Sequence, residues 1–275
     1  MSIPNLFAFM RERHAIWERK MAGQPKPWTQ DPILQSYRFC NVYRELDTVT
    51  IWINNNWRTP HYEDPDVWFA MAVARLVNWP GSMQLLGYPV PWNPSHFVRT
   101  LEDLRGSKVF TGAYMIPGGP AKMSKPFYLA TGVLDPMWEA RDRIRPCPGE
   151  PLADFHRRLT WFKGMGNFLA GQVVCDTKYT KAMEKAADWW TWACSGPGSK
   201  RGLNRALGRP VDAPWVEREW FRNFGLVKTI VDQLAFDAGM SPVHAQDLQN
   251  CLCEYDKYER VRLGEGKPRS KYAGV

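Results

Sequence analysis

Residues 159–170 read Leu-Thr-Trp-Phe-Lys-Gly-Met-Gly-Asn-Phe-Leu-Ala, and this stretch decides the fold. Apolar Leu159 and Phe162 close one predicted helix, and a second helix is predicted from Phe168 to Asp176. Ala170 lies on the face where the second helix would pack against the first, and its small side chain permits a close approach. The pattern therefore predicts a mostly α-helical fold organised around a helical hairpin.

The turn of this hairpin carries Gly164 and Gly166 on either side of Met165. The turn is expected to need both glycines, because a tight hairpin between helices demands positive φ or close backbone approach. The spacing resembles a helix-hairpin-helix, a module that holds a DNA phosphate on the hairpin amides and the N-terminus of the second helix. Lys163 and Asn167 flank this cradle and are expected to add side-chain donors. An ordinary turn between two core helices is the alternative interpretation.

The size and charge of the chain set broad limits on its organisation. Its 275 residues are 44% hydrophobic and carry a net charge of +8, which suits a substantial core and a polyanionic partner. We expect a single helical domain over residues 1–275, with the helix-hairpin-helix at 152–176. Two lobes divided near the Pro- and Gly-containing residues 146–151 are the alternative.

Several classes of site and partner are not expected. The six cysteines show no zinc or iron–sulfur spacing and the five histidines are dispersed, so no metal and no cofactor are predicted. No apolar run is long enough to span a membrane, and the N-terminal residues have no cleavable apolar core. These features favour a cytosolic protein without a membrane partner.

A long helix is predicted from Ile33 to Trp57. Arg38, Asn41, Arg44 and Glu45 would then share one face, because residues three or four apart lie together on a helix. This face is interpreted as a solvated surface or as the wall of a site. Further helices are predicted at Ile3–Met21, 66–79, 94–104, 127–134, 136–145, 181–192, 214–236 and 241–258.

Residues 195–205 read Ser-Gly-Pro-Gly-Ser-Lys-Arg-Gly-Leu-Asn-Arg, and they precede a predicted helix. Glycines, hydroxyls and cations together predict an anion-binding loop. The order differs from the Gly-x-x-x-x-Gly-Lys-Ser/Thr of a P-loop, so a nucleoside triphosphate is not expected. A solvent-exposed loop with a helix cap is the alternative. The residues predicted to bind the anion are Ser199, Lys200, Arg201, Asn204 and Arg205.

A helix-hairpin-helix followed by a carboxylate resembles the DNA glycosylase superfamily. In that superfamily a catalytic Asp follows the hairpin at a spacing that Asp188 reproduces after Gly164. The resemblance implies a glycosylase-like helical fold. The iron–sulfur cysteines of some members are absent from this sequence.

A closer resemblance covers nearly the whole chain. The chain resembles the phage family of thymine-hypermodification enzymes, which was named for α-glutamyl/putrescinyl thymine pyrophosphorylases and is associated with amino acid:DNA transferases. A similar helical domain occurs fused to a P-loop kinase that phosphorylates 5-hydroxymethyluracil in DNA. Since this chain has no P-loop, the stand-alone transferase is the better match. The segments that carry the resemblance are Gly23-Gln-Pro-Lys-Pro-Trp-Thr-Gln-Asp-Pro-Ile-Leu34, Tyr37-Arg-Phe-Cys-Asn-Val-Tyr-Arg-Glu-Leu-Asp47, Phe168-Leu-Ala-Gly-Gln-Val-Val174, Gly196-Pro-Gly-Ser-Lys-Arg-Gly-Leu-Asn-Arg205 and Cys251-Leu-Cys-Glu-Tyr-Asp-Lys-Tyr258.

The resemblance implies a reaction. The substrate is expected to be double-stranded phage DNA that carries a phosphorylated 5-hydroxymethyl-deoxyuridine. A free amino acid, glycine in related systems, would displace phosphate or pyrophosphate at the C5 methylene. We expect this step to take place in the host cytoplasm, in association with other hypermodification enzymes.

The candidate residues can be assigned to steps of that reaction. The base must be flipped from the stack, and the hairpin residues Lys163, Gly164, Gly166 and Asn167 would anchor the DNA beside it. The five residues of 199–205 named above would bind the leaving phosphate. The attacking ammonium must lose a proton to a carboxylate, for which the candidates in order are Asp188, Asp176, Glu45 and Asp47. The amino acid's carboxylate would be held by Arg38, Asn41 and Arg44.

Two other functions remain open at this point. The first is a glycosylase-like enzyme that excises the base. The second is a non-catalytic DNA-binding module that partners a 5-hydroxymethyluracil DNA kinase.

Overall fold

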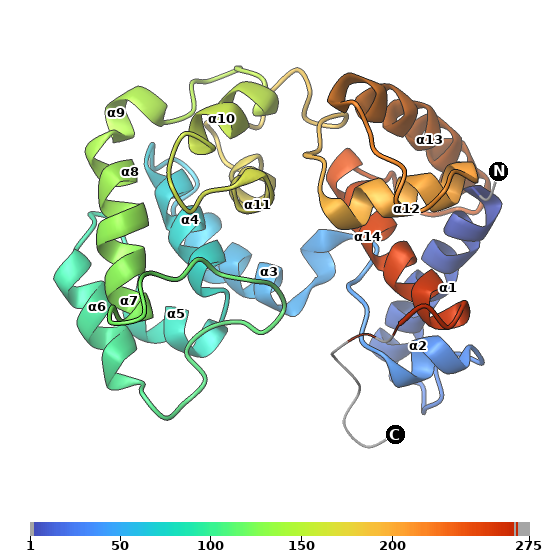
Figure 1. Ribbon diagram of the computed structural model, residues 1–275, viewed down its shortest axis with the longest axis horizontal. Helices are drawn as coiled ribbons and strands as arrows, with labels where there is room; N and C mark the ends of the chain where they lie inside the picture. The colour runs from blue at the N-terminus through green and yellow to red at the C-terminus, as the bar shows by residue number, and fades with distance from the viewer. Residues whose placement is uncertain (1–2, 267, 269–275) are drawn as a thin grey trace. The chain divides into compact units, whose positions relative to one another are not determined.

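Helices form the regular structure of this chain in a computed structural model that describes residues 3–266 and 268 (Figure 1). Within those residues no β-strand is found, so the prediction of a mostly α fold is confirmed. The chain divides into two compact units. The first comprises Met1–Asp47 and Ala193–Val275, and the second comprises Thr48–Trp192. Residues 146–151, which the sequence suggested as a division, lie inside the second unit between α9 (Arg141–Ile144) and α10 (Leu152–Leu159).

The first unit is built around one apolar core that joins the two ends of the chain. Leu6 and Met10 of the first helix are fully buried in it, as are Val227 and Leu252 of the last helices. The first helix has the predicted bounds, because its apolar side chains recur at helical spacing. The helices of this unit are α1 (Ile3–Met21), α2 (Pro32–Ser36), η1 (Arg44–Leu46), α12 (Pro197–Leu207), α13 (Glu217–Asp237) and α14 (Ala245–Arg262).

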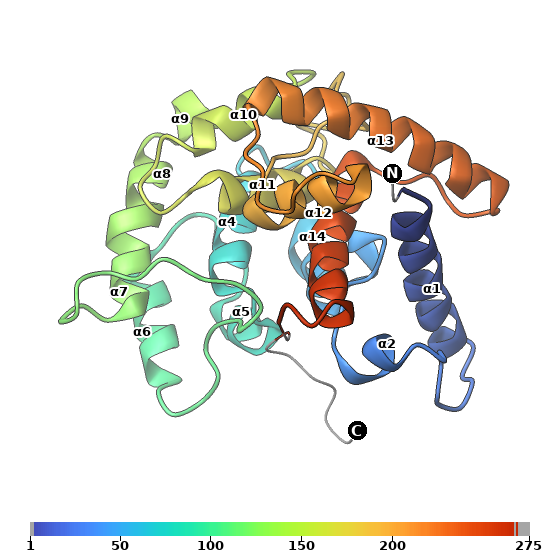
Figure 2. The same ribbon diagram turned by 45° about the vertical axis from the view of Figure 1, so that its right-hand side comes forward.

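Helix packing explains Gly198 and Gly202 of residues 195–205. Pro197 begins α12, so Gly198 and Gly202 lie within a helix and the prediction of a loop there is wrong. α12 and α14 lie side by side in both views (Figures 1 and 2). A Cβ on Gly202 would stand 2.0 Å from the Leu252 carbonyl oxygen, and one on Gly198 would stand 3.0 Å from Cys253 Sγ. Glycine is needed because the two helix backbones approach each other there.

Substitution of Gly202 by Ala is expected to lower the free energy of unfolding by about 3 kcal/mol, the upper end of ordinary overpacking. The reason is that the new methyl group meets the α14 backbone, which cannot rotate away as a side chain would. Gly225→Ala in α13 is the matched control, since a Cβ there meets nothing within 4 Å. That change should stabilise the protein by about 0.5–1 kcal/mol. Urea denaturation of both variants tests this account, and equal midpoints would contradict it.

The predicted long helix over residues 33–57 is not formed. α2 ends at Ser36, and Tyr37 is extended with φ −116° and ψ 147°. Asn41 then uses its side chain locally, with Nδ2 donating to the Leu46 carbonyl at 2.8 Å and to Asp47 Oδ1 at 3.0 Å. Such side-chain bonds to nearby backbone offer an alternative to helical hydrogen bonding. Arg38, Asn41, Arg44 and Glu45 therefore do not share one helical face.

The second unit surrounds α4, every residue of which is buried. α4 packs against α11, and a buried ion pair between Arg75 of α4 and Asp176 of α11 joins the two helices. The helices of this unit are α3 (Thr48–Ile53), the π-helical turn η2 (Asn54–Arg58), α4 (Val67–Val77), α5 (Pro80–Leu86), α6 (Pro94–Asp103), α7 (Lys125–Leu129), the π-helical turn η3 (Ala130–Leu134), α8 (Asp135–Glu139), α9 (Arg141–Ile144), α10 (Leu152–Leu159) and α11 (Asn167–Thr177). The segment 181–192, which was predicted to be helical, consists of turns.

Candidate functional site

The hairpin of the decisive stretch is formed by α10 and α11, which pack against each other. α10 ends at Leu159 and α11 begins at Asn167, close to the predicted ends. Ala170 is fully buried, as its predicted place between the helices requires. The local sequence therefore determines two helices and the turn that joins them.

The two hairpin glycines have different roles. Gly164 has φ +88°, and a Cβ there would meet Val133 Cγ2 at 2.8 Å, so both conformation and space require glycine. Gly166 has φ −66°, and a Cβ there would meet nothing within 4 Å. The expectation that the turn needs two glycines is thus wrong for Gly166. Met165 between them is 1% exposed and anchors the turn in the core.

The outer side of the hairpin presents groups that suit an anion. Lys163, Gly166, Asn167 and Phe168 are exposed. The first amides of α11 point out of the N-terminus of the helix, where no intrahelical acceptor exists. The positive end of the helix dipole lies there as well. Trp161, two residues before Lys163 in the sequence, is 66% exposed. This surface, residues 161–168, is called the hairpin surface below.

Gly164→Ala is expected to cost about 1–3 kcal/mol of stability, the usual penalty of a non-glycine residue held at strained backbone angles. Gly166→Ala should change stability by less than about 0.5 kcal/mol, as expected for a surface position with an ordinary φ. Thermal unfolding of the two variants makes the comparison. Equal tolerance of both changes would show that the turn does not depend on Gly164.

Asp188 lies at the other end of α10. Its Oδ1 accepts from the Leu152 amide at 2.7 Å and its Oδ2 accepts from the Ala153 amide at 3.1 Å. It therefore caps the first turn of α10. Since α10 has eight residues, its ends are about 12 Å apart, and Asp188 does not meet the hairpin surface.

Asp176 is fully buried in an ion pair. Its Oδ1 accepts from Arg75 Nη2 at 2.7 Å, and its Oδ2 accepts from Arg75 Nε. Arg75 also donates to Thr50 Oγ1 at 3.1 Å and to Asn78 Oδ1 at 3.0 Å. This arrangement fixes α4 to α11 and gives Asp176 a structural position. The sequence signal that identifies such a pair is Arg75 itself, a single cation within the otherwise apolar run of α4.

Asp47 is held by Asn41 in the first unit. Asp47 Oδ1 accepts from the Asn41 amide and from Asn41 Nδ2, both at 3.0 Å. Arg13 in turn orients Asn41 by donating to its Oδ1 at 2.8 Å and to the Phe39 carbonyl. Asn41 therefore positions Asp47, and its amide is not available for an amino acid. Arg13 was not a candidate in the sequence, since nothing local marks its partner.

Burial raises the pKa of Asp47 above its ordinary value, although the Asn41 bond and the Arg44 and Arg13 guanidiniums oppose this shift. In the described part of the chain, Asp47 Oδ2 receives no hydrogen bond. A carboxylate with a raised pKa and an open oxygen is suited to accept a proton.

Arg38, Arg44 and Glu45, the other candidates in segment 38–45, differ in burial and in their backbone partners. Arg44 is 8% exposed, and its amide donates to Asp247 Oδ1 at 2.9 Å. Arg38 is exposed, and its carbonyl accepts from Lys257 Nζ at 2.9 Å. Glu45 is half-buried on η1. Asn41 Nδ2 is already bonded to Leu46 and Asp47, so an amino acid held by Arg38, Asn41 and Arg44 would have to break these bonds.

The cations of α12 are paired with carboxylates. Lys200 Nζ lies 3.1 Å from Glu217 Oε2, in a half-exposed pair. Arg201 Nε lies 3.2 Å from Asp256 Oδ2, and its Nη1 pairs with Asp212. Arg205 Nε lies 2.8 Å from Asp256 Oδ1, with both side chains buried. A phosphate would have to displace these carboxylates, which is least costly for Lys200 and Arg201 at the surface.

The two polar side chains of α12 have structural contacts. Ser199 is fully buried, and its Oγ accepts from the Gly196 amide at 3.0 Å, which caps the helix. Asn204 is also buried and donates through Nδ2 to the Val211 and Ala213 carbonyls, both at 2.9 Å. The Ser199 contact caps the start of α12 and the Asn204 contacts hold the turn after it, so both side chains have structural partners.

Among residues 3–266 and 268, no group of three His, Cys, Asp or Glu side chains is placed to bind a metal ion. None of the described helices has the length and apolarity needed to cross a bilayer.

Comparison with known proteins gives two matches. A family model described as the helical domain of 5-hmdU DNA kinase matches residues 2–268. A 5-hmdU DNA kinase of Bacillus phage SP10 is 24% identical over 280 residues, which cover 92% of this chain and 44% of the phage enzyme. The chain thus spans less than half the length of this relative. No solved structure matches the chain.

Proposed function

This chain belongs to the family of 5-hmdU DNA kinase helical domains, and from that premise we propose that it acts in the modification of 5-hydroxymethyl-deoxyuridine in phage DNA. The proposed reaction is transfer of an amino acid to the phosphorylated base in duplex DNA. The observation that supports DNA binding is the hairpin surface. It combines a buried anchor, Met165, with the exposed N-terminus of α11 and the cation of Lys163.

The proposed chemistry is a substitution at the C5 methylene. The amino group forms a new C–N bond as the C–O bond to the phosphate breaks, and the phosphate leaves with the bonding electrons. One proton must pass from the ammonium to a base before attack. Of the candidate carboxylates, Asp47 fits this role best, since burial raises its pKa and one of its oxygens is open. Asp188 and Asp176 have both oxygens engaged in structural bonds.

Stabilisation of the leaving phosphate is assigned to Lys200 and Arg201. Their carboxylate partners Glu217 and Asp212 are 50% and 76% exposed, so exchange for a phosphate costs little. Arg205 stays with buried Asp256 in this scheme.

The deciding experiment is mass spectrometry of nucleosides from kinase-treated 5-hydroxymethyluracil DNA, incubated with this protein and a mixture of amino acids. The expected product is a nucleoside heavier than unphosphorylated 5-hydroxymethyl-deoxyuridine by one amino acid residue. A free base and an abasic site would instead indicate a glycosylase. Unchanged phosphorylated nucleoside would refute the transferase.

A non-catalytic DNA-binding module is the second candidate function. It is favoured by one observation, that the matching relative is a kinase of which this chain covers 44%. In that case DNA binding and association with a kinase remain, and no new nucleoside forms.

DNA binding by the hairpin surface is common to both functions. Lys163→Gln is expected to reduce the slope of log affinity against log salt concentration by about one, the loss of one phosphate contact. Lys185→Gln, at another exposed position of the second unit, is the control and should leave the slope unchanged. Fluorescence anisotropy over a salt series measures both slopes. If Lys163→Gln and the wild type have the same slope, Lys163 does not contact a DNA phosphate and the hairpin surface is not the DNA-binding surface.

A further inference from the structure

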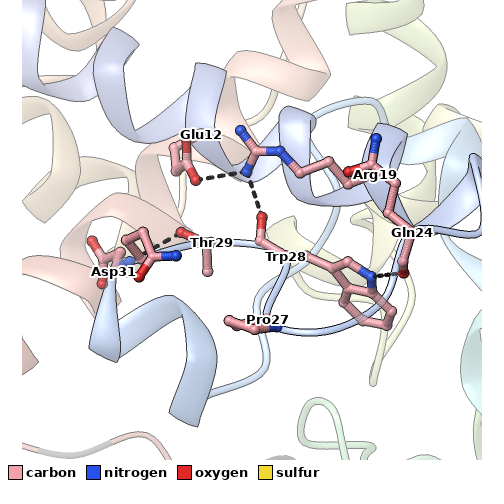
Figure 3. A pocket seen from close by; sticks show the side chains of 8 residues that line it. Glu12, Arg19, Gln24, Pro27, Trp28, Thr29 and Asp31 are labelled. Carbon is pink, nitrogen blue, oxygen red and sulfur yellow. Dashed lines mark hydrogen bonds and ion pairs between the residues drawn. The ribbon is translucent and has the colours of Figure 1, made fainter.

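The first unit contains a cavity of about 520 Å³ that no role described above uses. It lies between α1 and the loop that leads into α2, and Glu12, Arg19, Trp28 and Asp31 contribute to its wall (Figure 3). The loop is part of the segment Gly23–Leu34, one of the segments that carry the family resemblance. The volume falls in the range of small-molecule sites.

Arg19 presents a guanidinium whose plane is fixed. Its Nη1 donates to Glu12 Oε1 at 3.0 Å and to the Trp28 carbonyl, as the dashed lines of Figure 3 mark. Its Nε and Nη2 have no acceptor in the part of the chain that the structure describes. A guanidinium held on one side and open on the other is prepared to bind a carboxylate with two parallel hydrogen bonds.

Two carboxylates line the same cavity as this cation. Glu12 uses Oε1 for Arg19, while its Oε2 has no donor among the described residues. Asp31 adds a second carboxylate, which caps α2 through Oδ1 and accepts from the Tyr258 hydroxyl at 2.6 Å through Oδ2. The cavity therefore offers a group that can bind an anion, Arg19, next to a group that can bind an ammonium, Glu12.

An aromatic face completes the wall. Trp28 is half-buried, and its indole Nε1 donates to the Gln24 carbonyl at 2.7 Å, which fixes the ring. Such a ring supplies apolar contact area at small entropic cost. The combination fits a ligand that carries a carboxylate and an ammonium on neighbouring atoms, with room for a side chain.

We propose that this cavity binds a free α-amino acid. Its carboxylate lies on the open edge of Arg19, its ammonium on Glu12 Oε2, and its side chain against Trp28. On the function proposed above, this amino acid is the transferred donor, so the cavity takes the role that the sequence assigned to Arg38, Asn41 and Arg44. A plain amine or an inorganic anion satisfies only half of these groups.

The test is isothermal titration of the full chain, without DNA, against glycine and a panel of larger amino acids. At least one amino acid should bind, and its C-terminal amide and its N-acetyl form should each bind about tenfold more weakly or worse, since each loses a charge-assisted contact. Arg19→Lys keeps the charge but loses the planar fork and should weaken binding about tenfold. Glu12→Gln is the second variant and should weaken it similarly. Arg11→Gln, exposed on α1 outside this wall, is the control.

The outcomes separate this site from the proposed function. Absence of binding by every amino acid, or affinity unaltered in both Arg19→Lys and Glu12→Gln, overturns the site. Transfer to DNA with an unchanged KM for the amino acid in these variants also overturns it, while the transferase stands. Binding that the two variants weaken, with no transferred product from the wild type, supports the site and refutes the transferase.

Discussion

Replacement of Asp176 by Asn should lower the free energy of unfolding by about 3–5 kcal/mol, the cost of leaving one partner of a buried ion pair uncompensated. Asp176 is fully buried and Arg75 is 5% exposed, so water cannot replace the lost charge. Thr50 and Asn78 each accept one hydrogen bond from Arg75, but neither carries a negative charge. The second unit loses the bond that joins α4 to α11.

Denaturant unfolding followed by tryptophan fluorescence measures this loss. Asp154→Asn is the matched control, because Asp154 and Arg157 form an exposed pair and should contribute less than about 1 kcal/mol. The double variant Arg75→Met with Asp176→Leu should recover most of the stability, since it removes both charges together. If Asp176→Asn is as stable as the wild type but inactive in transfer, Asp176 is catalytic and the structural assignment is wrong.

The sequence correctly predicted those helices whose own apolar spacing is enough to identify them. α1 carries apolar residues at helical spacing over its whole length, and α13 does so after Pro214, so both are evident from the sequence. The hairpin turn was also predictable, because its two deciding residues, Gly164 and Met165, are neighbours in the sequence. Segment 33–57 was mispredicted because Asn41 and Asp47 bond to the nearby backbone and compete with a helix.

Long-range contacts decided the rest, and no local pattern contains them. From the sequence, Gly202 resembles part of an anion-binding loop. In the structure, a Cβ at this position would lie 2.0 Å from the Leu252 carbonyl oxygen, so the glycine is needed for helix packing. Arg201 looks available for a phosphate until Asp256 of α14 is placed beside it. Asp188 has the spacing of a catalytic residue, yet it bonds the Leu152 amide at the start of α10. Residue types at the right spacing predict chemistry only when the fold leaves them unpaired.

Asp47 is the candidate base whose removal should have the largest effect on turnover. Asp47→Asn keeps the Oδ1 acceptor for Asn41, so the local fold should survive, whereas proton acceptance is lost. We expect transfer to fall by about 10²–10⁴-fold, the usual contribution of a general base. Single-turnover transfer to phosphorylated DNA measures the rate. Glu45→Gln is the comparison variant, and a loss of turnover there rather than in Asp47→Asn would make Glu45 the base.

The pH dependence of stability tests Asp47 without any assumption about catalysis. Because burial raises its folded-state pKa, the folded protein holds the Asp47 proton more tightly than the unfolded chain does. Its contribution to the free energy of unfolding therefore falls as pH rises from the ordinary Asp pKa through the raised one. Asp47→Asn should lack that fall and should equal or exceed the wild type in stability at neutral pH. If the variant instead loses stability at neutral pH, the Asp47 charge is stabilised in the fold, and its raised pKa no longer supports a role as base.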